Sequence, residues 1–349
     1  MSPQELRGKK PERKTKMQPP LPGETTAILP DLHWVRMPLP LPPHHVNCWL
    51  LRDGDGWLLI DTSARVEGTL AWWDSIFENV LEGRPVTRML ATHFHYDHVG
   101  LAGYMCERWQ APLLMSRTEY FLSRLLLAED PESLREQQLE LGRKAGAPES
   151  YLRYLENRSA LYRTEVTPLP PSFQRLRAGD SLRIGGREWR VRIGQGHAPE
   201  MVCLYCAELG VLIGADQILP RISPYIGVMS WEMEGDPLSD FLASNHGFLD
   251  LPEDTLVLPS HGDPFTGLHT RIAWLEDHHA ERLATLSAAL DTPLTAYDAS
   301  RVLFPRVMEN SQISFVLGEG MAHLHRLMAT GEVVREEGAD GLPRYRRAG

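Results

Sequence analysis

Short apolar runs separated by turn residues dominate the first part of this sequence. The runs at 33–37, 46–51 and 57–61 are rich in β-branched and aromatic residues and predict three strands of a β-meander. Asp53-Gly54-Asp55-Gly56 predicts a hairpin turn between the last two. Helical spacing follows at 69–81 and 102–109, on either side of an apolar run that ends at Ala91. This half of the chain therefore mixes strands and helices.

The second half repeats this mixture. Runs at 181–184 and 189–193 flank Gly185-Gly186, which predicts another hairpin, and runs at 201–205 and 211–213 predict two further strands. Segments 236–249 and 269–290 have the period of amphipathic helices.

Residues 117–165 interrupt this pattern. Leucine and aromatic residues recur there at helical spacing, and Pro131 and Pro148 mark breaks. The segment is interpreted as an inserted helical hairpin or lid. It would form a wall of a substrate pocket, or it would only pack on the sheet or form a dimer contact.

The last sixty residues predict a compact tail. Segments 299–304, 312–317 and 319–330 predict three helices, and 333–335 and 343–345 flank a turn as a β-hairpin. Over 291–349, eight Asp and Glu stand against seven Arg, a balance that favours packing over nucleic-acid binding.

Composition sets broader limits. A hydrophobic fraction of 42% and a charged fraction of 23% are typical of soluble globular proteins. No apolar stretch approaches the roughly 20 residues needed to cross a bilayer. Residues 1–25 are basic and then proline-rich, with no apolar run to make a secretory signal, so they predict a disordered tail and a cytoplasmic protein.

Four cysteines make a disulfide framework improbable in a chain of 349 residues. Cys203 and Cys206 have the CxxC spacing of a metal or redox site. They lie three apart in a predicted strand and would face opposite sides of it, so we interpret them as two buried thiols.

The candidate chemistry is concentrated in one short run after the apolar residues 89–91. His93, His95, Asp97 and His98 bring three imidazoles and a carboxylate into six positions. These are ligands that divalent metals prefer. In a loop at a strand end, His93 and His95 can share one metal while Asp97 and His98 reach a second.

This HxHxDH run resembles the signature of the metallo-β-lactamase superfamily. Three later motifs, each after a short apolar run, resemble its other ligand motifs in order: Gly194-Gln195-Gly196-His197, Gly214-Ala215-Asp216 and Pro259-Ser260-His261-Gly262. The resemblance covers roughly 30–290 and implies an α+β fold, a four-layer αββα sandwich. The branch of β-lactamase-like protein 2 and glyoxalase II is the most similar, since some of its members carry a winged-helix tail. The expected domains are a catalytic domain at 26–290 and a winged-helix-like domain at 291–349.

The resemblance also implies a ligand set for two divalent metal ions. One would be held by His93, His95 and His197, the other by Asp97, His98 and His261, with Asp216 bridging. Zinc is expected first, with iron or manganese as alternatives. Asp61, at the end of a buried run, would brace the metal loop. Asp97 could orient the nucleophile, and Tyr225 is a weaker candidate to hydrogen-bond a substrate oxygen.

A water shared by two such ions loses a proton near neutral pH, and the resulting hydroxide can attack a carbonyl or phosphoryl group. The expected function is hydrolysis of a small-molecule ester, thioester or lactone. A nucleic-acid-processing nuclease is the alternative. Diiron flavoproteins of the superfamily carry Glu where this chain has His95, which disfavours an oxygen reductase. The expected partner is an acyl substrate, with neither nucleic acid nor membrane, and a homodimer is an open possibility. The remaining histidines considered are predicted at the surface or at an interface: His44, His45, His278, His279, His323 and His325.

Overall fold

The computed structural model describes residues 17–157, 162–306 and 310–349. Most of the predicted N-terminal tail, residues 1–16, lies outside these described residues. Residues 17–24 lead into strand β1 (Thr25–Leu29), which the sequence did not predict. Across the described ranges, no helix is both long and apolar enough to cross a lipid bilayer.

The first sheet has seven strands in the order β1 to β7 and contains the predicted meander. Strands β2, β3 and β4 are antiparallel, whereas β4 to β7 run parallel because helices connect them. The elements are β2 (Leu32–Pro38), β3 (His45–Asp53), β4 (Gly56–Ile60), α2 (Thr69–Asn79), β5 (Val86–Leu90), α3 (Tyr96–Val99), α4 (Ala102–Trp109), β6 (Leu113–Met115) and β7 (Gln174–Arg175).

The second sheet has five strands in the order β12, β11, β10, β9 and β8. Strands β8 to β11 are antiparallel as the hairpin turns predict, and β11 pairs in parallel with β12. The elements are β8 (Ser181–Ile184), β9 (Arg187–Gly194), β10 (Met201–Cys206), β11 (Val211–Ala215), α9 (Pro237–His246), β12 (Leu256–Pro259) and α10 (Leu268–Ala289).

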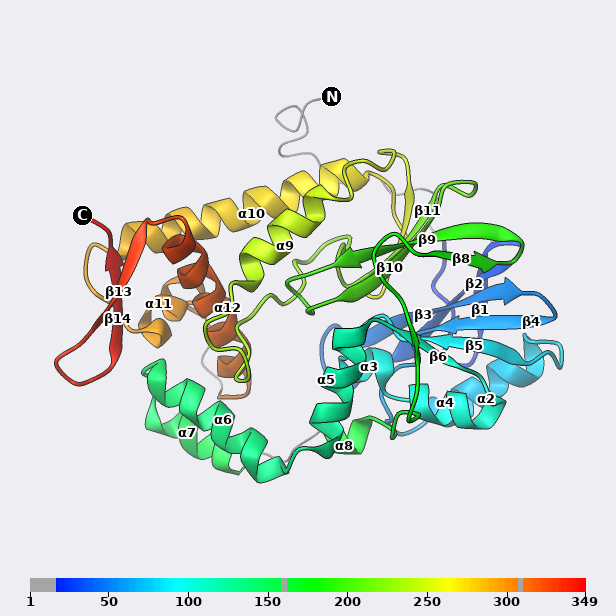
Figure 1. The fold of residues 1–349 in the computed structure, drawn as a ribbon, viewed down its shortest axis with the longest axis horizontal. Coiled ribbons are helices and arrows are strands. Elements are labelled where there is room, and N and C mark those ends of the chain that lie inside the picture. The colour runs from blue at the N-terminus through cyan, green and yellow to red at the C-terminus, as the bar shows by residue number, and fades with distance from the viewer. Residues whose placement is uncertain (1–16, 158–161, 307–309) are drawn as a thin grey trace.

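The two sheets pack face to face between layers of helices (Figure 1), so the four-layer αββα architecture is confirmed. Trp34 of the first sheet and Trp189 of the second share the core between them. Cys206 faces this core, while Cys203 faces the core on the other side of its sheet. Both thiols are buried and free, as predicted for two strand positions three apart.

The inserted segment is helical as predicted and serves two different cores. Its helices are α5 (Arg117–Ala128), α6 (Pro131–Lys144), α7 (Glu149–Glu156) and α8 (Tyr162–Glu165). Leu122 of α5 packs in the core that contains Phe94, next to the predicted ligands. Helices α6 and α7 lie apart from the sheets (Figure 1), and Tyr151 of α7 hydrogen-bonds Ser314 over 2.8 Å. The two halves of the insertion therefore support different parts of the molecule.

The C-terminal part contains α11 (Ala296–Leu303), α12 (Asn310–Ala329), β13 (Val333–Glu337) and β14 (Pro343–Arg347). The hairpin is confirmed, but the separate helices predicted at 312–317 and 319–330 are wrong, since α12 is continuous. Gly318 and Gly320 do not break this helix. A Cβ atom would overlap the Tyr225 hydroxyl at Gly318 and the Ser300 hydroxyl at Gly320, so these glycines permit close packing. The winged-helix identity stays a prediction.

Some of the histidines predicted at the surface are buried instead. His44 is exposed as expected, but His279, His323 and His325 are almost fully buried. His279 of α10 and His323 of α12 face each other with ring nitrogens 3.3 Å apart. His325 donates to the carbonyl of Gly235 over 2.7 Å. The prediction of a surface or interface position is wrong for these three, because α10 packs against α12 and α12 is covered on several sides.

Candidate metal centre

Loops at the ends of five strands meet at one edge of the two sheets. β4 runs parallel to β5, and β11 runs parallel to β12. β9 has the same direction as β11 because both are antiparallel to β10, and strands that run in the same direction end on the same side. The loops after β4, β5, β9, β11 and β12 carry Asp61, residues 93–98, His197, Asp216 and His261.

His93, His95 and His197 form the first triad. One ligand atom of each lies within 4.8 Å of the others, and Nε2 of His93 is 2.9 Å from Nδ1 of His95. Gly196 has a positive φ of 96°, which glycine adopts without strain. A Cβ there would overlap Phe241, so the glycine lets the loop approach α9 just before His197.

Asp97, His98 and His261 form the second triad, again with ligand atoms within 4.8 Å of one another. Oδ2 of Asp97 is 3.6 Å from Nε2 of His98 and 3.5 Å from Nε2 of His261. Asp97 and His98 belong to the single turn of α3, so one short helix presents both.

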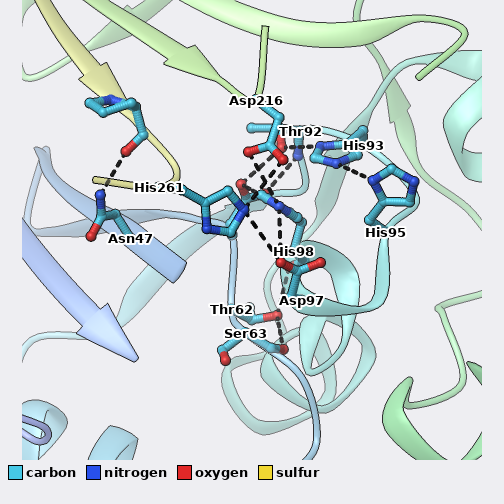
Figure 2. Close-up of polar contacts among 12 residues, drawn as sticks. Asn47, Thr62, Ser63, Thr92, His93, His95, Asp97, His98, Asp216 and His261 are labelled. Atoms are coloured by element: carbon cyan, nitrogen blue, oxygen red, sulfur yellow. Dashed lines mark hydrogen bonds and ion pairs between the residues drawn. The ribbon is translucent and has the colours of Figure 1, made fainter. Parts of the chain in front are cut away.

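Asp216 lies between the two triads. Its Oδ1 is 3.6 Å from Nε2 of His98, and its Oδ2 is 3.3 Å from Nε2 of both His197 and His261. One carboxylate therefore touches ligands of both groups. The structure brings all seven predicted ligands together. Figure 2 shows how the labelled ones converge: His93, His95, Asp97, His98, Asp216 and His261.

The polar atoms at the centre of this cluster fit divalent metal ions. Nε2 of His98, Nε2 of His197 and Oδ1 of Asp216 are buried without a hydrogen-bond partner in the described part of the chain. Buried polar atoms in proteins are nearly always paired, so three such atoms facing each other indicate a missing partner. Imidazole nitrogen and carboxylate oxygen are ligands that zinc and similar ions take.

Charge distribution at the centre supports the same conclusion. Burial and neighbouring imidazoles lower the pKa of His93 and His95 well below the usual value, so both rings are neutral lone-pair donors. Burial alone would also lower the pKa of His98, but Asp97, Asp216 and Asp61 outweigh it and raise that pKa to about 10. In the metal-free protein His98 therefore holds a proton, which a bound cation would displace.

Asp61 holds both ends of the ligand loop, at Thr92 and at His98. Its carboxylate accepts hydrogen bonds from the backbone N–H of Thr92, the hydroxyl of Thr92 and Nδ1 of His98, at 2.8, 2.8 and 2.9 Å. Asp61 is almost completely buried and has a positive φ of 58°, which is uncommon for a residue other than glycine. These contacts are those expected of a bracing residue.

Two other histidines are oriented by backbone carbonyls. Nδ1 of His197 donates to the carbonyl of Tyr225, and Nδ1 of His261 donates to the carbonyl of His45, both over 2.7 Å. A proton fixed on Nδ1 leaves the lone pair on Nε2 free for a metal. Tyr225 thus reaches the site through its backbone. Its phenol lies against Gly318 in edge contact with Phe315, and its role toward a substrate stays a prediction.

Asn47 is a supporting residue that the sequence did not single out. It is fully buried on β3 and donates through Nδ2 to the carbonyls of Pro259 and Gly262, both over 2.8 Å. Its Oδ1 accepts from the indole of Trp34 over 2.8 Å. Asn47 therefore fixes the loop that carries His261. A polar residue inside an otherwise apolar strand was the available signal.

Glu119 is the second supporting residue that the sequence did not reveal. From the first turn of α5 its buried carboxylate accepts the backbone N–H of Phe94 over 2.9 Å and that of Glu200 over 2.6 Å. It thereby ties the loop between His93 and His95 to the loop after His197. Burial raises the pKa of Glu119 to about 7. On a helix with many charged residues, no sequence signal distinguishes it.

Comparison with known proteins gives a consistent assignment. The family described as "Metallo-beta-lactamase superfamily" matches residues 41–282, and "Metallo-beta-lactamase-like, C-terminal domain" matches 283–348. A β-lactamase domain protein from Burkholderia ambifaria is 39% identical, with a TM-score of 0.89 over 95% of this chain and 96% of its own. A metallo-β-lactamase family protein from Thermus thermophilus is 31% identical, with a TM-score of 0.78 over 92% of this chain and 100% of its own. A probable metallo-hydrolase of Bacillus subtilis (strain 168) is 26% identical over 86% of this chain and 92% of its own.

Proposed function

We propose that this chain, which belongs to the metallo-β-lactamase superfamily and is a metallo-hydrolase, cleaves an ester, thioester or lactone of a small molecule with two divalent metal ions. Zinc is the ion that the donor set suits best, with iron or manganese as alternatives. The chemistry that such ions supply when bound is Lewis acidity, which brings the pKa of water toward 7 and polarises a carbonyl oxygen.

The observation that carries this proposal is the convergence of unpaired buried atoms on one point. Nε2 of His98 and of His197 and Oδ1 of Asp216 lack hydrogen-bond partners in the described residues, and they belong to seven ligand side chains that converge there. A structural histidine cluster would satisfy these atoms internally, since leaving each unpaired costs about 1–3 kcal/mol.

The exposure of the ligands indicates where a substrate enters. His93, His98 and His261 are buried, whereas His95 and Asp97 are partly exposed. We therefore expect the scissile carbonyl to approach from the side of these two residues. Asp97 is also close to two imidazoles, and it can accept a hydrogen bond from the attacking water and take up its proton.

Apolar side chains beside the ligands suit an acyl substrate. The ring of Phe94 is 4.4 Å from that of His95, and the partly exposed ring of Trp231 is 6.0 Å from Phe94 in an edge contact. From the insertion, Tyr162 of α8 donates to the carbonyl of Phe94 over 2.7 Å. We propose that Trp231 and the α5–α8 side of the insertion form the pocket wall, while α6 and α7 support the C-terminal part.

The arginines of the C-terminal hairpin favour a small-molecule substrate over nucleic acid. Arg335 pairs with Glu234, Arg344 with Asp340, Arg346 with Glu336 and Arg347 with Asp291. Cations already paired with carboxylates release fewer counterions when they meet a phosphate backbone, so they contribute little affinity.

A hydrolysis panel tests this function. The zinc-loaded protein should be assayed with thioesters, lactones, simple esters, β-lactams and phosphodiesters, alongside metal-free protein. We expect the zinc-loaded protein to hydrolyse acyl substrates, and we expect no turnover by the metal-free protein. Turnover confined to phosphodiesters would replace the proposal by the nuclease alternative. No turnover of any acyl substrate by fully metallated protein would contradict it.

A further inference from the structure

The loop that carries His261 is held along its backbone by the neighbouring strands β2 and β3. The backbone N–H of Asn47 donates to the carbonyl of Ser260 over 2.6 Å. Arg36, which faces Asn47 in the antiparallel strand pair, donates to the carbonyl of Gly262 over 2.6 Å, and Nδ2 of Asn47 donates to the same carbonyl over 2.8 Å. These contacts fix the loop on both sides of the ligand.

His45, the first residue of β3, contacts the same loop twice. Its carbonyl accepts from Nδ1 of His261 over 2.7 Å. Its imidazole accepts the backbone N–H of Gly262 at Nε2, over 2.8 Å. One residue therefore holds both the side chain of the ligand and the peptide unit that follows it.

These two contacts close a ring through His45, His261 and Gly262. A peptide unit is planar, so holding the N–H of Gly262 fixes the plane of the His261–Gly262 peptide. Gly262 has a positive φ of 84°, so the chain turns directly after the ligand, in a conformation that glycine adopts without strain. Turning the backbone or the imidazole of His261 would break at least one of the two bonds.

The same contacts determine where the protons lie. A ring nitrogen that faces a backbone N–H must offer a lone pair, so Nε2 of His45 is an acceptor and the proton of that ring is on Nδ1. This lone pair is therefore not free to bind a metal ion. In His261 the proton is on Nδ1, so Nε2 is left to face Asp97 at 3.5 Å and Asp216 at 3.3 Å.

We propose that the imidazole of His45 is a positioning residue for His261, acting through the backbone N–H of Gly262. This inference rests on the proposed metal centre. The side chain of His45 is only partly buried, and its contact with the loop gives it a defined task at the site. Without the imidazole, the N–H of Gly262 would lose its acceptor, and the peptide would turn to find another.

Three substitutions change the imidazole of His45 and leave its backbone carbonyl in place. His45→Ala removes the acceptor, and His45→Leu replaces the ring by an apolar side chain. His45→Gln keeps an acceptor, since the amide oxygen of glutamine can reach the position of Nε2. His44→Asn is the matched control, because His44 is the exposed neighbour and asparagine tolerates its positive φ of 65°.

Zinc affinity, measured by competition with a chromophoric chelator, is the first readout. We expect one of the two sites to weaken by about 10–100-fold in His45→Ala and His45→Leu, the range typical of residues that orient metal ligands. The other site should keep the affinity of the parent, because His45 does not contact His93, His95 or His197 through either of these bonds. His45→Gln and His44→Asn should match the parent at both sites.

The second readout uses metal-free protein labelled with ¹⁵N-histidine. The Nδ1–H signals of His261 and His197 are assigned with His261→Asn and His197→Asn. In His45→Ala and His45→Leu the His261 signal should exchange faster with water or vanish. His197 donates to the carbonyl of Tyr225 in the other triad, so its signal should persist in every His45 variant. If His45→Ala fails to fold, His45→Leu carries both measurements.

Two results would overturn the inference. One is a parent-like affinity with an unchanged His261 signal in the folded variants. The other is an equal loss at both metal sites with both N–H signals altered, because that result would indicate general loosening rather than positioning. The second readout requires neither turnover nor metal, so failure of the substrate panel would contradict the proposed function and leave this test intact.

Discussion

Nδ1 of His98 donates to Oδ2 of Asp61 over 2.9 Å, and both side chains are almost completely buried. Asp61 comes from the end of β4 and His98 from the helix after β5, so this contact joins neighbouring parallel strands beneath the centre. It also holds the Nδ1 proton of His98 and directs Nε2 at Asp216, 3.6 Å away.

Asp61→Asn should weaken metal binding. An amide has one acceptor oxygen for the three donors that the carboxylate now accepts, so His98 would lose its orientation. We expect metal affinity to fall by about 10–100-fold, measured by chelator competition. Asp53→Asn is the control. Asp53 forms an ion pair with Arg88, 2.7 Å away, and this pair does not contact the ligands. Parent-like affinity of Asp61→Asn would show that Thr92 and the loop suffice.

The protein purified without chelator should contain two metal ions per chain. The seven ligands form two triads around one carboxylate, and two-metal hydrolases hold their ions about 3.5 Å apart. Elemental analysis gives the stoichiometry, and X-ray absorption gives the separation. Removing the ions with a chelator should lower Tm, because bound metal stabilises only the folded state. A stoichiometry that stays at one under metal excess would contradict the dinuclear centre.

Asp216→Ala should abolish most activity while the fold survives. The carboxylate touches His98, His197 and His261, so its loss affects both triads, but the core between the sheets stays intact. We expect turnover to fall by more than about 100-fold, beyond the range typical of supporting residues. Circular dichroism and metal analysis complete the measurement. Asp250→Ala, which removes a surface partner of Arg192, should behave like the parent. An active, fully metallated Asp216→Ala protein would show that another carboxylate bridges.

Glu119 should make the stability of the metal-free protein depend on pH. Burial raises its pKa to about 7 in the folded state, from a usual value of 4.5. The folded state therefore holds the proton more tightly. The contribution of protonated Glu119 to the free energy of unfolding is fully present below pH 4.5. It is lost as the pH rises through 7, an effect of up to ~3 kcal/mol.

Urea unfolding between pH 4.5 and 8, with chelator present, measures this dependence. The free energy of unfolding should fall less steeply with pH in Glu119→Gln than in the parent, although that variant should be less stable overall because one N–H loses its acceptor. Glu188→Gln is the control, since Glu188 pairs with Arg190 at the surface and is not among the groups that shift the pKa of Glu119. Equal slopes for parent and Glu119→Gln would contradict the prediction.

Trp231 should determine how strongly acyl chain length affects turnover. Burial of each methylene against an apolar wall contributes roughly 0.8 kcal/mol, so kcat/KM should rise with chain length in the parent until the wall is covered. Trp231→Ala should flatten this rise without changing metal content. Trp72→Ala removes a partly buried tryptophan that packs on the first core and should leave the dependence unchanged. If Trp231→Ala keeps the parent's chain-length profile, Trp231 is not part of the wall.

Much of the fold and most of the ligand set could be predicted from local sequence patterns and motifs. Most strands of the two sheets and the helix α10 follow from apolar periodicity, because each such element buries one or both faces and its sequence must match. The strands β1, β6 and β7 were not predicted. His93, His95, Asp97 and His98 are neighbours in the chain, so their proximity needs no long-range folding. His197, Asp216 and His261 could be assigned because their motifs resemble those of the metallo-β-lactamase superfamily, and the apolar run before each one placed it at a strand end.

Tertiary structure alone decided what supports those ligands. Asn47 meets Gly262, and Glu119 meets Glu200, across long stretches of chain that only the packed sheets bring together. The carbonyl of Tyr225 has no side-chain signature, since every residue carries one, so its role at His197 could not be predicted from sequence.

Gly318 of α12 illustrates the same difference between what the sequence predicts and what the tertiary structure decides. The sequence predicted two helices, at 312–317 and 319–330, and Gly318 lies between them. In the folded protein α12 continues through it, since the absence of a Cβ lets the Tyr225 hydroxyl approach the helix. Periodicity along the chain thus determined which residues form most of the elements and their buried faces. Which backbones approach closely, and which buried polar groups pair, was decided only when those elements packed, because such contacts depend on geometry between segments rather than on spacing within one.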